Sequence, residues 1–419
     1  MTKITPKTLK GFRDFLPLEA RKRQYVINTL KEVFERYGFE PLETPVLEYE
    51  EILAGKYGDE GDQLMYRFED NGKRRVAMRY DQTVPTARVV AQYGSASSPQ
   101  GAPLLPIPFK RYQIQPVWRA ENTQKGRYRE FVQCDIDTIG IDSALSDAEI
   151  IATAVEFCKK LGFKNFKVLI NDRKVFEKLS TQAIITIDKL KKIGEDGVCE
   201  ELVKKQIVGS TAEAKITLQE LLDREPTERL IEIFKALEQL GVDQDVVEFS
   251  PTLARGLNYY TGMIFEIEVA DYPVGSICGG GRYDELIGMF ADRQIPAVGL
   301  ALGFDRTIEA MEALGLFPTD VEKSSTQVLV TIFSEDLKQK SLEIASKLRN
   351  ENINAEIYLG EIKEKNALEK QLKYADAKAI PYVIILGQKE IEKNSLTLRN
   401  MQTREQEEGS LDEILQKLA

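Results

Sequence analysis

Residues 109–140 read FKRYQIQPVWRAENTQKGRYREFVQCDIDTIG, and this stretch decides the fold around it. Its two arms, RYQIQPVWRA and YREFVQCDI, alternate apolar and polar residues and are rich in β-forming side chains, which predicts two strands. The segment between them, ENTQKG, is polar and contains Gly126, which is typical of a turn. The stretch is therefore predicted to form a β-hairpin.

Three arginines of this hairpin, Arg119, Arg127 and Arg129, indicate what it could hold. The guanidinium fork donates two parallel hydrogen bonds and suits phosphate better than the point charge of lysine. Surface ion pairs, which contribute little to stability, would be the simpler interpretation of a lone arginine pair. Here Trp118 and Phe131 are interleaved with the charges, which favours a partly buried site for a polyanion.

The composition is that of an ordinary globular protein, with 42% hydrophobic and 30% charged residues. A chain of 419 residues is expected to form roughly two or three domains. The net charge of −10 argues against a general nucleic-acid coat but permits a local basic surface. No apolar run of about 18 residues and no apolar signal region is present, so a cytoplasmic location without a membrane span is expected.

Cysteine and histidine usage limits the chemistry. The four cysteines lack CxxC spacing, which argues against a zinc site or a disulfide framework. The chain has no histidine, which excludes Ser–His and Cys–His nucleophilic pairs, His-ligated metals and imidazole acid–base catalysis. Any reaction must therefore depend on arginines, carboxylates, backbone groups and a bound ion.

The pattern along the chain predicts four segments. Mixed helical and strand-like pieces fill residues 1–171, and strand-like pieces resume over residues 249–320. Between them, residues 172–248 consist of charged amphipathic helices, which we expect to form a helical insertion. After a polar boundary, residues 325–419 alternate as β-α-β-α-β, which predicts a small doubly wound α/β domain.

Two helices of the first segment can be given approximate limits. Apolar residues at helical spacing run from Tyr25 to Tyr37, and Gly38 is expected to end that helix. A second helix is predicted over residues 144–162, with Ser146 as N-cap and Glu149 completing a capping box.

Three short runs in the second half add candidate site residues. Glycines 279–281 lack P-loop spacing and by themselves favour a tight bend in a sheet, although backbone could also approach a ligand there. The run RGLNYY from Arg255 to Tyr260 places a cation beside two phenols, which either pack in the core or face a ligand. The run VGLALGFDR predicts the first turns of a buried helix that carries Arg306.

Taken in order, these motifs resemble the histidyl-tRNA synthetases, a family of class II aminoacyl-tRNA synthetases. The resemblance covers essentially the whole chain: KGFRDFLP, the hairpin WRAEN…GRYREF…CDID, ARGLNYYTG, GGGRYDEL and VGLALGFDR. RGLNYYTG is the discriminating string. The resemblance implies an α+β catalytic domain with a mixed, largely antiparallel sheet and a helical insertion, followed by a small α/β anticodon-binding domain.

The same resemblance implies an ATP site. Arg119 and Arg255 would act on the α-phosphate as the catalytic residues, because they would stabilise the charge that develops there. Around them would lie Glu121 on the adenine side, Arg127 at the β- and γ-phosphates, and Phe131 and Arg306 on the two faces of adenine. No side-chain base is needed, since an ionised carboxylate of the substrate is already a nucleophile.

For histidine, the resemblance implies contacts to the α-amino group from Asp81, Thr83 and Gln133. A carboxylate, Asp137, would accept an imidazole N–H, and an apolar isostere would leave it unpaired. The full implied histidine-binding set is Asp81, Thr83, Gln133, Asp137, Arg255, Tyr259, Tyr260 and Tyr283. The implied partners are ATP with Mg²⁺, L-histidine, tRNA(His) and a second copy of the chain in a homodimer.

Three positions depart from the commonest family pattern. Asp81 stands where many members have Glu, Asn258 replaces the Asp of RGLDYY, and Asp305 replaces a Glu before the motif arginine. The first shortens the reach by one methylene, and the second removes a negative charge. The third matters if that carboxylate helps to hold a metal ion.

Other classes of protein remain as alternatives. The nearest is the synthetase-like regulatory subunit of ATP phosphoribosyltransferase, which lacks the last domain and tends to lose ATP-contacting residues. A class II synthetase for another amino acid would lack RGLNYYTG, and a pure nucleic-acid-binding protein would not need the arginine hairpin.

Overall fold

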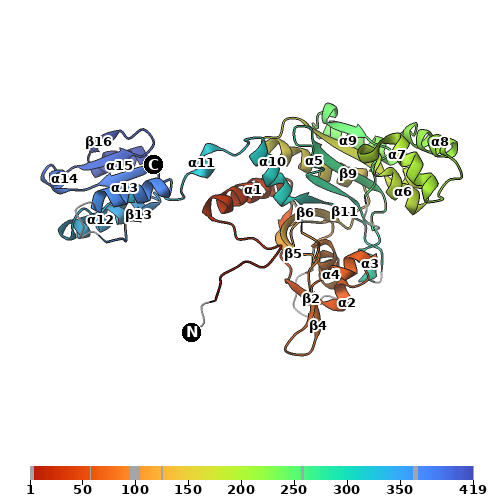
Figure 1. The fold of residues 1–419 in the computed structure, drawn as a ribbon, viewed down its shortest axis with the longest axis horizontal. Coiled ribbons are helices and arrows are strands. Elements are labelled where there is room, and N and C mark those ends of the chain that lie inside the picture. The colour runs from red at the N-terminus through yellow and green to blue at the C-terminus, as the bar shows by residue number, and fades with distance from the viewer. Residues whose placement is uncertain are drawn as a thin grey trace. The chain divides into compact units, whose positions relative to one another are not determined.

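The computed structural model describes residues 4–56, 58–94, 104–123, 126–255, 259–291, 293–361 and 367–418, without side chains at 58–60. The chain divides into two compact units (Figure 1), which are described separately below. The first unit is Met1–Leu16 with Arg23–Leu316, and the second is Pro17–Lys22 with Phe317–Ala419. No described helix is long and apolar enough to cross a membrane.

The predicted hairpin is confirmed as β5 (Phe109–Trp118) and β6 (Glu130–Ile139), which pair antiparallel with Trp118 opposite Glu130. It lies inside an eight-stranded sheet in which the neighbouring strands are antiparallel except for the pairs β1–β5 and β7–β8. The strand order is β1 (Glu40–Pro41), β5, β6, β11 (Ala297–Gly303), β10 (Cys278–Arg282), β9 (Met263–Val269), β7 (Phe166–Asp172) and β8 (Val247–Phe249). The expected mixed, largely antiparallel sheet is confirmed.

The structure corrects two predictions about small residues. Residues 297–303, predicted as the start of a buried helix, form strand β11, and helix α10 (Phe304–Ala313) begins only at Phe304. Glycines 279–281, for which a tight bend was favoured, lie in the extended strand β10. The two strands need small residues because they approach closely: a Cβ on Gly280 would lie 2.1 Å from the Gly299 carbonyl oxygen.

Helices cover this sheet. Helix α5 (Ala144–Lys160) packs on β6, β11 and β10, and α10 packs on β6 and β11. The predicted N-cap of α5 is wrong: Ser143 caps it by accepting from the Leu145 amide. Ser146 lies within the helix and donates to the Ser143 carbonyl instead. The helix predicted up to Gly38 is α1 (Pro17–Arg36), and Gly38 adopts a φ of 76° that suits glycine.

Four helices follow β7, and three of them begin at a hydroxyl N-cap. Ser180, Ser210 and Thr227 each accept from a backbone amide three residues on. The helices are α6 (Thr181–Ile187), α7 (Leu190–Lys204), α8 (Thr211–Leu222) and α9 (Glu228–Gln239). The apolar core of α6, α7 and α8 includes Tyr260 and Ile264, so it is continuous with the strands of the large sheet, whereas α9 packs against α5. The limits predicted for this insertion, and for the other segments, stay predictions.

The remaining elements of the first unit form a small layer. A three-stranded sheet has the order β2 (Leu47–Tyr49), β4 (Arg75–Met78) and β3 (Arg67–Glu69), and α2 (Glu50–Leu53), α3 (Gly58–Gln63) and α4 (Thr83–Tyr93) accompany it. Short 3-10 turns occupy Arg173–Phe176, Gln244–Val246 and Ile287–Met289.

The second unit is a five-stranded sheet with a hydrophobic core on each face. Val328 and Val330 point into one core and Leu329 into the other, as expected for a sheet covered on both sides. Its strands are β13 (Ala355–Ile357), β12 (Val328–Val330), β14 (Tyr382–Ile385), β15 (Leu396–Asn400) and β16 (Gln406–Gly409). Its helices are α11 (Thr319–Glu322), α12 (Lys338–Asn350), α13 (Ala367–Ala377), α14 (Gln388–Glu392) and α15 (Leu411–Leu418), with a 3-10 turn at Glu335–Leu337. The predicted parallel strands β13, β12 and β14 are present, but β15 and β16 extend the sheet antiparallel.

Candidate active site

A cavity of about 380 Å³ opens on the face of the large sheet that carries the hairpin arginines. Most of the predicted site residues line it: Asp81, Thr83, Arg119, Glu121, Arg127, Phe131, Gln133, Arg255, Tyr259, Tyr260 and Arg306. Two predicted residues, Asp137 and Tyr283, lie deeper, where they are 3% exposed each and contact one another. Asn258 lies outside the described residues.

The floor of the cavity includes Gly279 and Ala301, and small residues there and beside it leave room for functional side chains. A Cβ on Gly279 would lie 1.8 Å from Arg255 Nη1, and one on Gly299 would lie 1.9 Å from Asp137 Oδ1. A Cβ on Gly281 would lie 2.5 Å from the Met263 carbonyl oxygen and 2.9 Å from the Tyr260 ring, so backbone excludes a side chain there as well. Gly279 and Gly299 are therefore required for side chains of the site, a role that their sequence pattern did not reveal.

Arg119 is held between two aromatic rings. Its guanidinium carbon lies 4.4 Å from the Tyr80 ring centroid and 5.1 Å from that of Phe131, and its Nε donates to the Tyr80 carbonyl at 3.1 Å. A guanidinium has several N–H donors in a fixed plane, so these contacts orient the plane and leave donors for an anion. Tyr80 was not among the sequence candidates, because a tyrosine gives no signal of this role.

Two further arginines stand at the cavity wall. Arg306, at the start of α10, donates from Nη1 to the Ser276 carbonyl at 2.6 Å. Arg127, on the hairpin turn, has a side chain 61% exposed and lies 3.3 Å from Glu121. An exposed pair of this length is weak, so Arg127 can readily exchange its partner for a ligand phosphate.

Arg255 forms an ion pair with Glu266 of β9, at 2.8 Å. Burial lowers the pKa of Arg255, but its neighbours, with Glu266 as the ion-pair partner, outweigh this and leave its pKa raised, so the group stays cationic. Glu266 was missed by the sequence analysis. Strand register places Glu266 opposite Gly279 of the neighbouring strand, and therefore on the cavity face of the sheet.

Asp137 is held by two buried groups. Arg111, which is fully buried on β5, forms an ion pair with it, and the Tyr283 hydroxyl donates to Asp137 Oδ1. Burial raises the pKa of Asp137, although Arg111 and the Tyr283 hydroxyl oppose this. Arg111 was not a candidate either, and its place opposite Asp137 follows from the register of the hairpin.

Three tyrosines form a cluster beside this carboxylate. The ring centroids of Tyr259 and Tyr260 are 4.8 Å apart, and those of Tyr259 and Tyr283 are 6.0 Å apart. Burial raises the pKa of all three phenols, which therefore stay protonated and able to donate.

The segment with Asp81 and Thr83 is fastened to the hairpin by its neighbours. Gln82 is fully buried and donates to the carbonyls of Gln115 and Gln133, at 2.8 and 3.1 Å. Arg79 donates to the carbonyls of Pro116 and Thr44, at 2.8 and 2.6 Å, and burial lowers its pKa to about 10. Gln82 and Arg79 thus position the first turn of α4, where Asp81 accepts from the Val84 amide.

Asp305, the third departure from the family pattern, is engaged by two arginines. Arg13 and Arg23 lie 2.9 and 2.6 Å from Asp305 Oδ1. This pairing gives the carboxylate a structural partner on the side of the N-terminal segment. Within the described residues, no group of three or more Asp, Glu or Cys side chains is arranged to hold a metal ion.

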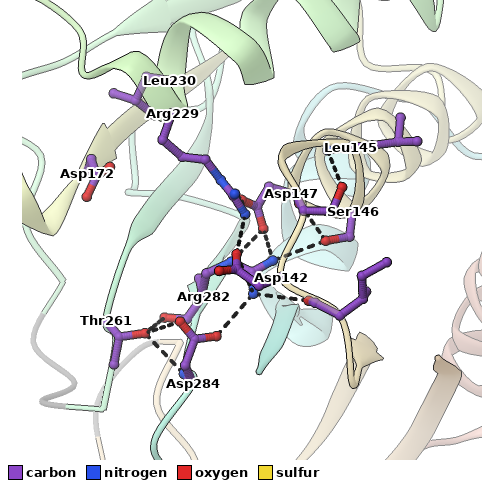
Figure 2. Close-up of polar contacts among 12 residues, drawn as sticks. Asp142, Leu145, Ser146, Asp147, Asp172, Arg229, Leu230, Thr261, Arg282 and Asp284 are labelled. Atoms are coloured by element: carbon purple, nitrogen blue, oxygen red, sulfur yellow. Dashed lines mark hydrogen bonds and ion pairs between the residues drawn. The ribbon is translucent and has the colours of Figure 1, made fainter. Parts of the chain in front are cut away.

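Behind the cavity, Arg282 at the end of β10 lies in a buried polar network (Figure 2). Its Nη2 lies 2.5 Å from Asp147 Oδ1 of α5, and its Nη1 lies 3.0 Å from Asp284 Oδ1. Arg229 of α9 donates to Asp147 Oδ2 at 2.9 Å and extends toward it from the upper part of Figure 2. Thr261, which follows Tyr260, donates to Asp284 Oδ2 at 3.0 Å. The network therefore connects α5 and α9 with the segment that carries the tyrosines.

We expect Asp147→Asn to destabilise the first unit by about 3–5 kcal/mol, because Arg282 would lose its fully buried carboxylate partner and keep only Asp284, which is 34% exposed. Asp142 also contacts Arg229, at 2.9 Å, but is 65% exposed. Asp142→Asn should therefore cost only about 0–1 kcal/mol. Urea unfolding of the two variants measures the difference, and equal losses would show that the network does not stabilise the unit in this way.

The fold and the site define a class of protein. A mixed, largely antiparallel sheet with an arginine-bearing hairpin, and with an arginine at the start of the helix after its central strand, is the catalytic fold of class II aminoacyl-tRNA synthetases. The family model for histidyl-tRNA synthetase matches residues 11–207 and 199–307, and the model for an anticodon binding domain matches residues 327–419. The chain therefore belongs to the histidyl-tRNA synthetase family.

Individual relatives match over the full length. The chain is 38% identical to a histidine–tRNA ligase of Cytophaga hutchinsonii, with 99% of each chain covered. It is 39% identical to a histidine–tRNA ligase of Rhodopirellula baltica, over 97% of this chain and 95% of the relative. Among solved structures, histidyl-tRNA synthetase from Nostoc sp. PCC 7120 aligns with a TM-score of 0.83 and 30% identity, over 99% of each chain.

Proposed function

We propose that this chain is a histidine–tRNA ligase, which activates L-histidine with ATP to histidyl-adenylate and pyrophosphate and then transfers histidine to the 3′ end of tRNA(His). One observation carries the assignment to this cavity. Its wall is cationic, with Arg119, Arg127 and Arg306, whereas buried carboxylates lie beneath the neighbouring part of its floor. Such a division suits a ligand pair that presents phosphates on one side and an ammonium and N–H groups on the other.

In the activation step, the histidine carboxylate attacks the α-phosphorus of ATP and pyrophosphate leaves. Negative charge increases on the α-phosphate oxygens in the transition state, so fixed cations there lower the barrier. Arg119, oriented by Tyr80 and Phe131, and Arg255, charged and paired with Glu266, are the residues that we assign to this role. No general base is required, because the attacking carboxylate is already ionised.

Selection of histidine is assigned to the buried group around Asp137. Its carboxylate is fixed by Arg111 and Tyr283 and cannot move to solvent, so it prefers a ligand that brings an N–H donor. A side chain of similar size without such a donor would leave the carboxylate less well satisfied, which costs several kcal/mol. Asp81, Thr83 and Gln133 would receive the α-ammonium group.

We expect Mg²⁺ to enter the site bound to ATP. Among the carboxylates that line the cavity, Asp305 is engaged by Arg13 and Arg23, and Glu121, which we place on the adenine side, makes one weak pair with Arg127. We therefore expect the ion to be held chiefly by phosphate oxygens. Its contribution would be to neutralise phosphate charge.

The regulatory-subunit alternative is disfavoured by two features of this chain. The four arginines expected to contact ATP are all present at or near the cavity, and residues 327–419 match an anticodon-binding domain.

Aminoacylation of tRNA tests the assignment directly. The purified chain with ATP should charge tRNA(His) with histidine and leave other tRNAs uncharged. Failure to charge tRNA(His) would overturn it. The homodimer and the cytoplasmic location stay proposals, and light scattering in solution tests the first.

The glycine floor gives a prediction with an internal control. Gly279→Ala should displace Arg255 and slow histidine-dependent ATP–pyrophosphate exchange by about 10²-fold, because a shift of about 1 Å at a positioned group is costly. Its melting temperature should stay close to that of the wild type. Gly280→Ala instead meets backbone, 2.1 Å from the Gly299 carbonyl, and should lower the melting temperature markedly. If both variants lost activity only in proportion to stability, the floor would be merely structural.

A further inference from the structure

Asp135 is a buried carboxylate that has no hydrogen-bond partner among the described residues. It is 2% exposed, and neither of its oxygens accepts a hydrogen bond in the described part of the chain. Buried polar groups are almost always bonded, and an ionised carboxylate without a donor is especially costly. The activation step does not require this residue.

Strand register places Asp135 on the face of the cavity. Asp135 lies two residues from both Gln133 and Asp137 on β6, so the three side chains share one face of the sheet. It lies opposite Gln113 on one neighbouring strand and Ala301 on the other. Gln133 and Ala301 both line the cavity. Asp135 is therefore beneath the cavity floor, between the positions assigned to the α-ammonium group and to the imidazole.

The charges around Asp135 do not provide the missing bond. Arg111 is engaged by Asp137 and donates to Gln113 at 3.3 Å. The charged and titratable neighbours of Asp135 are Arg111, Asp137, Asp81, Arg119, Tyr260 and the thiols of Cys134 and Cys278. Burial raises the pKa of Asp135 well above its usual range, with the neighbouring carboxylates adding to the effect against the two arginines.

We propose that Asp135 is a further amino-acid-binding residue, whose carboxylate accepts an N–H group of the bound amino acid between Gln133 and Asp137. The free amino acid supplies what the pocket lacks, because its ammonium brings both a positive charge and several donors. A cation at this point favours the ionised carboxylate, so binding should release a proton from Asp135. The inference rests on the proposed function, since it concerns how the same site recognises histidine.

The test compares Asp135→Asn with the wild type in histidine-dependent ATP–pyrophosphate exchange. Asparagine keeps the shape and one acceptor but loses the charge, so the KM for histidine should rise by about 10- to 100-fold. The KM for ATP should stay within about twofold. Asp135→Ser, a smaller buried acceptor, should show the same split and guards against a folding defect in one variant. Thr138→Val is the matched control, because its buried hydroxyl also lacks a partner among the described residues but lies on the other face of β6.

Calorimetric titration with L-histidine in two buffers of different ionisation enthalpy supplies a second measurement. The wild type should release a fraction of a proton per histidine bound, and Asp135→Asn should not release it. An unchanged histidine KM in both Asp135 variants, equal rises in both KM values, or the same effect in Thr138→Val would overturn the inference. If the wild type itself shows no histidine-dependent exchange, the proposed function fails instead, so the two failures are distinguishable.

Discussion

Replacing Arg255 by alanine is expected to slow adenylate formation by about 10³-fold while the protein stays folded. Arg255 is the cation paired with Glu266, and its pKa stays raised despite burial, so it brings a permanent charge to the α-phosphate. The partner left behind, Glu266, is 23% exposed and can be hydrated or protonated. The loss should therefore fall on kcat rather than on stability.

Histidine-dependent ATP–pyrophosphate exchange together with thermal unfolding measures both parts of this prediction. Glu266→Gln is the control, because it removes the partner and keeps the cation, and we expect it to retain most of the exchange rate. If Arg255→Ala kept its activity, another group would have to stabilise the charge on the α-phosphate. A large fall in melting temperature would instead mark the ion pair as a structural element.

Asp137→Ala is expected to raise the KM for histidine by about 10³- to 10⁴-fold and to leave the KM for ATP nearly unchanged. The structure adds a second consequence. Arg111 is fully buried against Asp137, so the alanine variant leaves an uncompensated charge and should lose about 3–5 kcal/mol of stability. The exchange rate measured at varied histidine with saturating ATP, and at varied ATP with saturating histidine, gives the two KM values. Urea unfolding gives the free energy of unfolding.

The double variant Arg111→Met with Asp137→Leu separates these effects. Removing both charges replaces the ion pair by apolar side chains and should restore most of the stability. Histidine recognition should remain lost, because no carboxylate is left to accept the imidazole N–H. If the double variant regained a normal KM for histidine, Asp137 would be a structural residue and the imidazole would bind elsewhere.

Local patterns predicted the hairpin and the first helix, because alternation and helical spacing are properties of short segments. The same reasoning failed for residues 297–303. A run of Gly, Ala and Leu carries no clear period, and its strand conformation depends on two neighbouring strands that need small residues. Ser146 was misplaced as a cap because Glu149 gives it the spacing of a capping box, whereas Ser143, three residues earlier, lacks that spacing and yet caps the helix.

The candidate site was partly predictable for a related reason. Motif resemblance supplied the residues that would contact ligands, and eleven of the thirteen line one cavity. It did not supply their supporting partners. Arg111 reaches Asp137, and Glu266 reaches Arg255, through strand register, which depends on pairings between segments far apart in the chain. Asp135 was missed because its environment, rather than its residue type, makes it unusual.

The most direct test of the account is ATP–pyrophosphate exchange by the purified chain, measured with each amino acid in turn. Histidine should support exchange at a rate far above that of every other amino acid, because only histidine brings an imidazole N–H to Asp137. Exchange supported by a different amino acid, or no exchange with histidine while the chain binds an ATP phosphoribosyltransferase subunit, would contradict it.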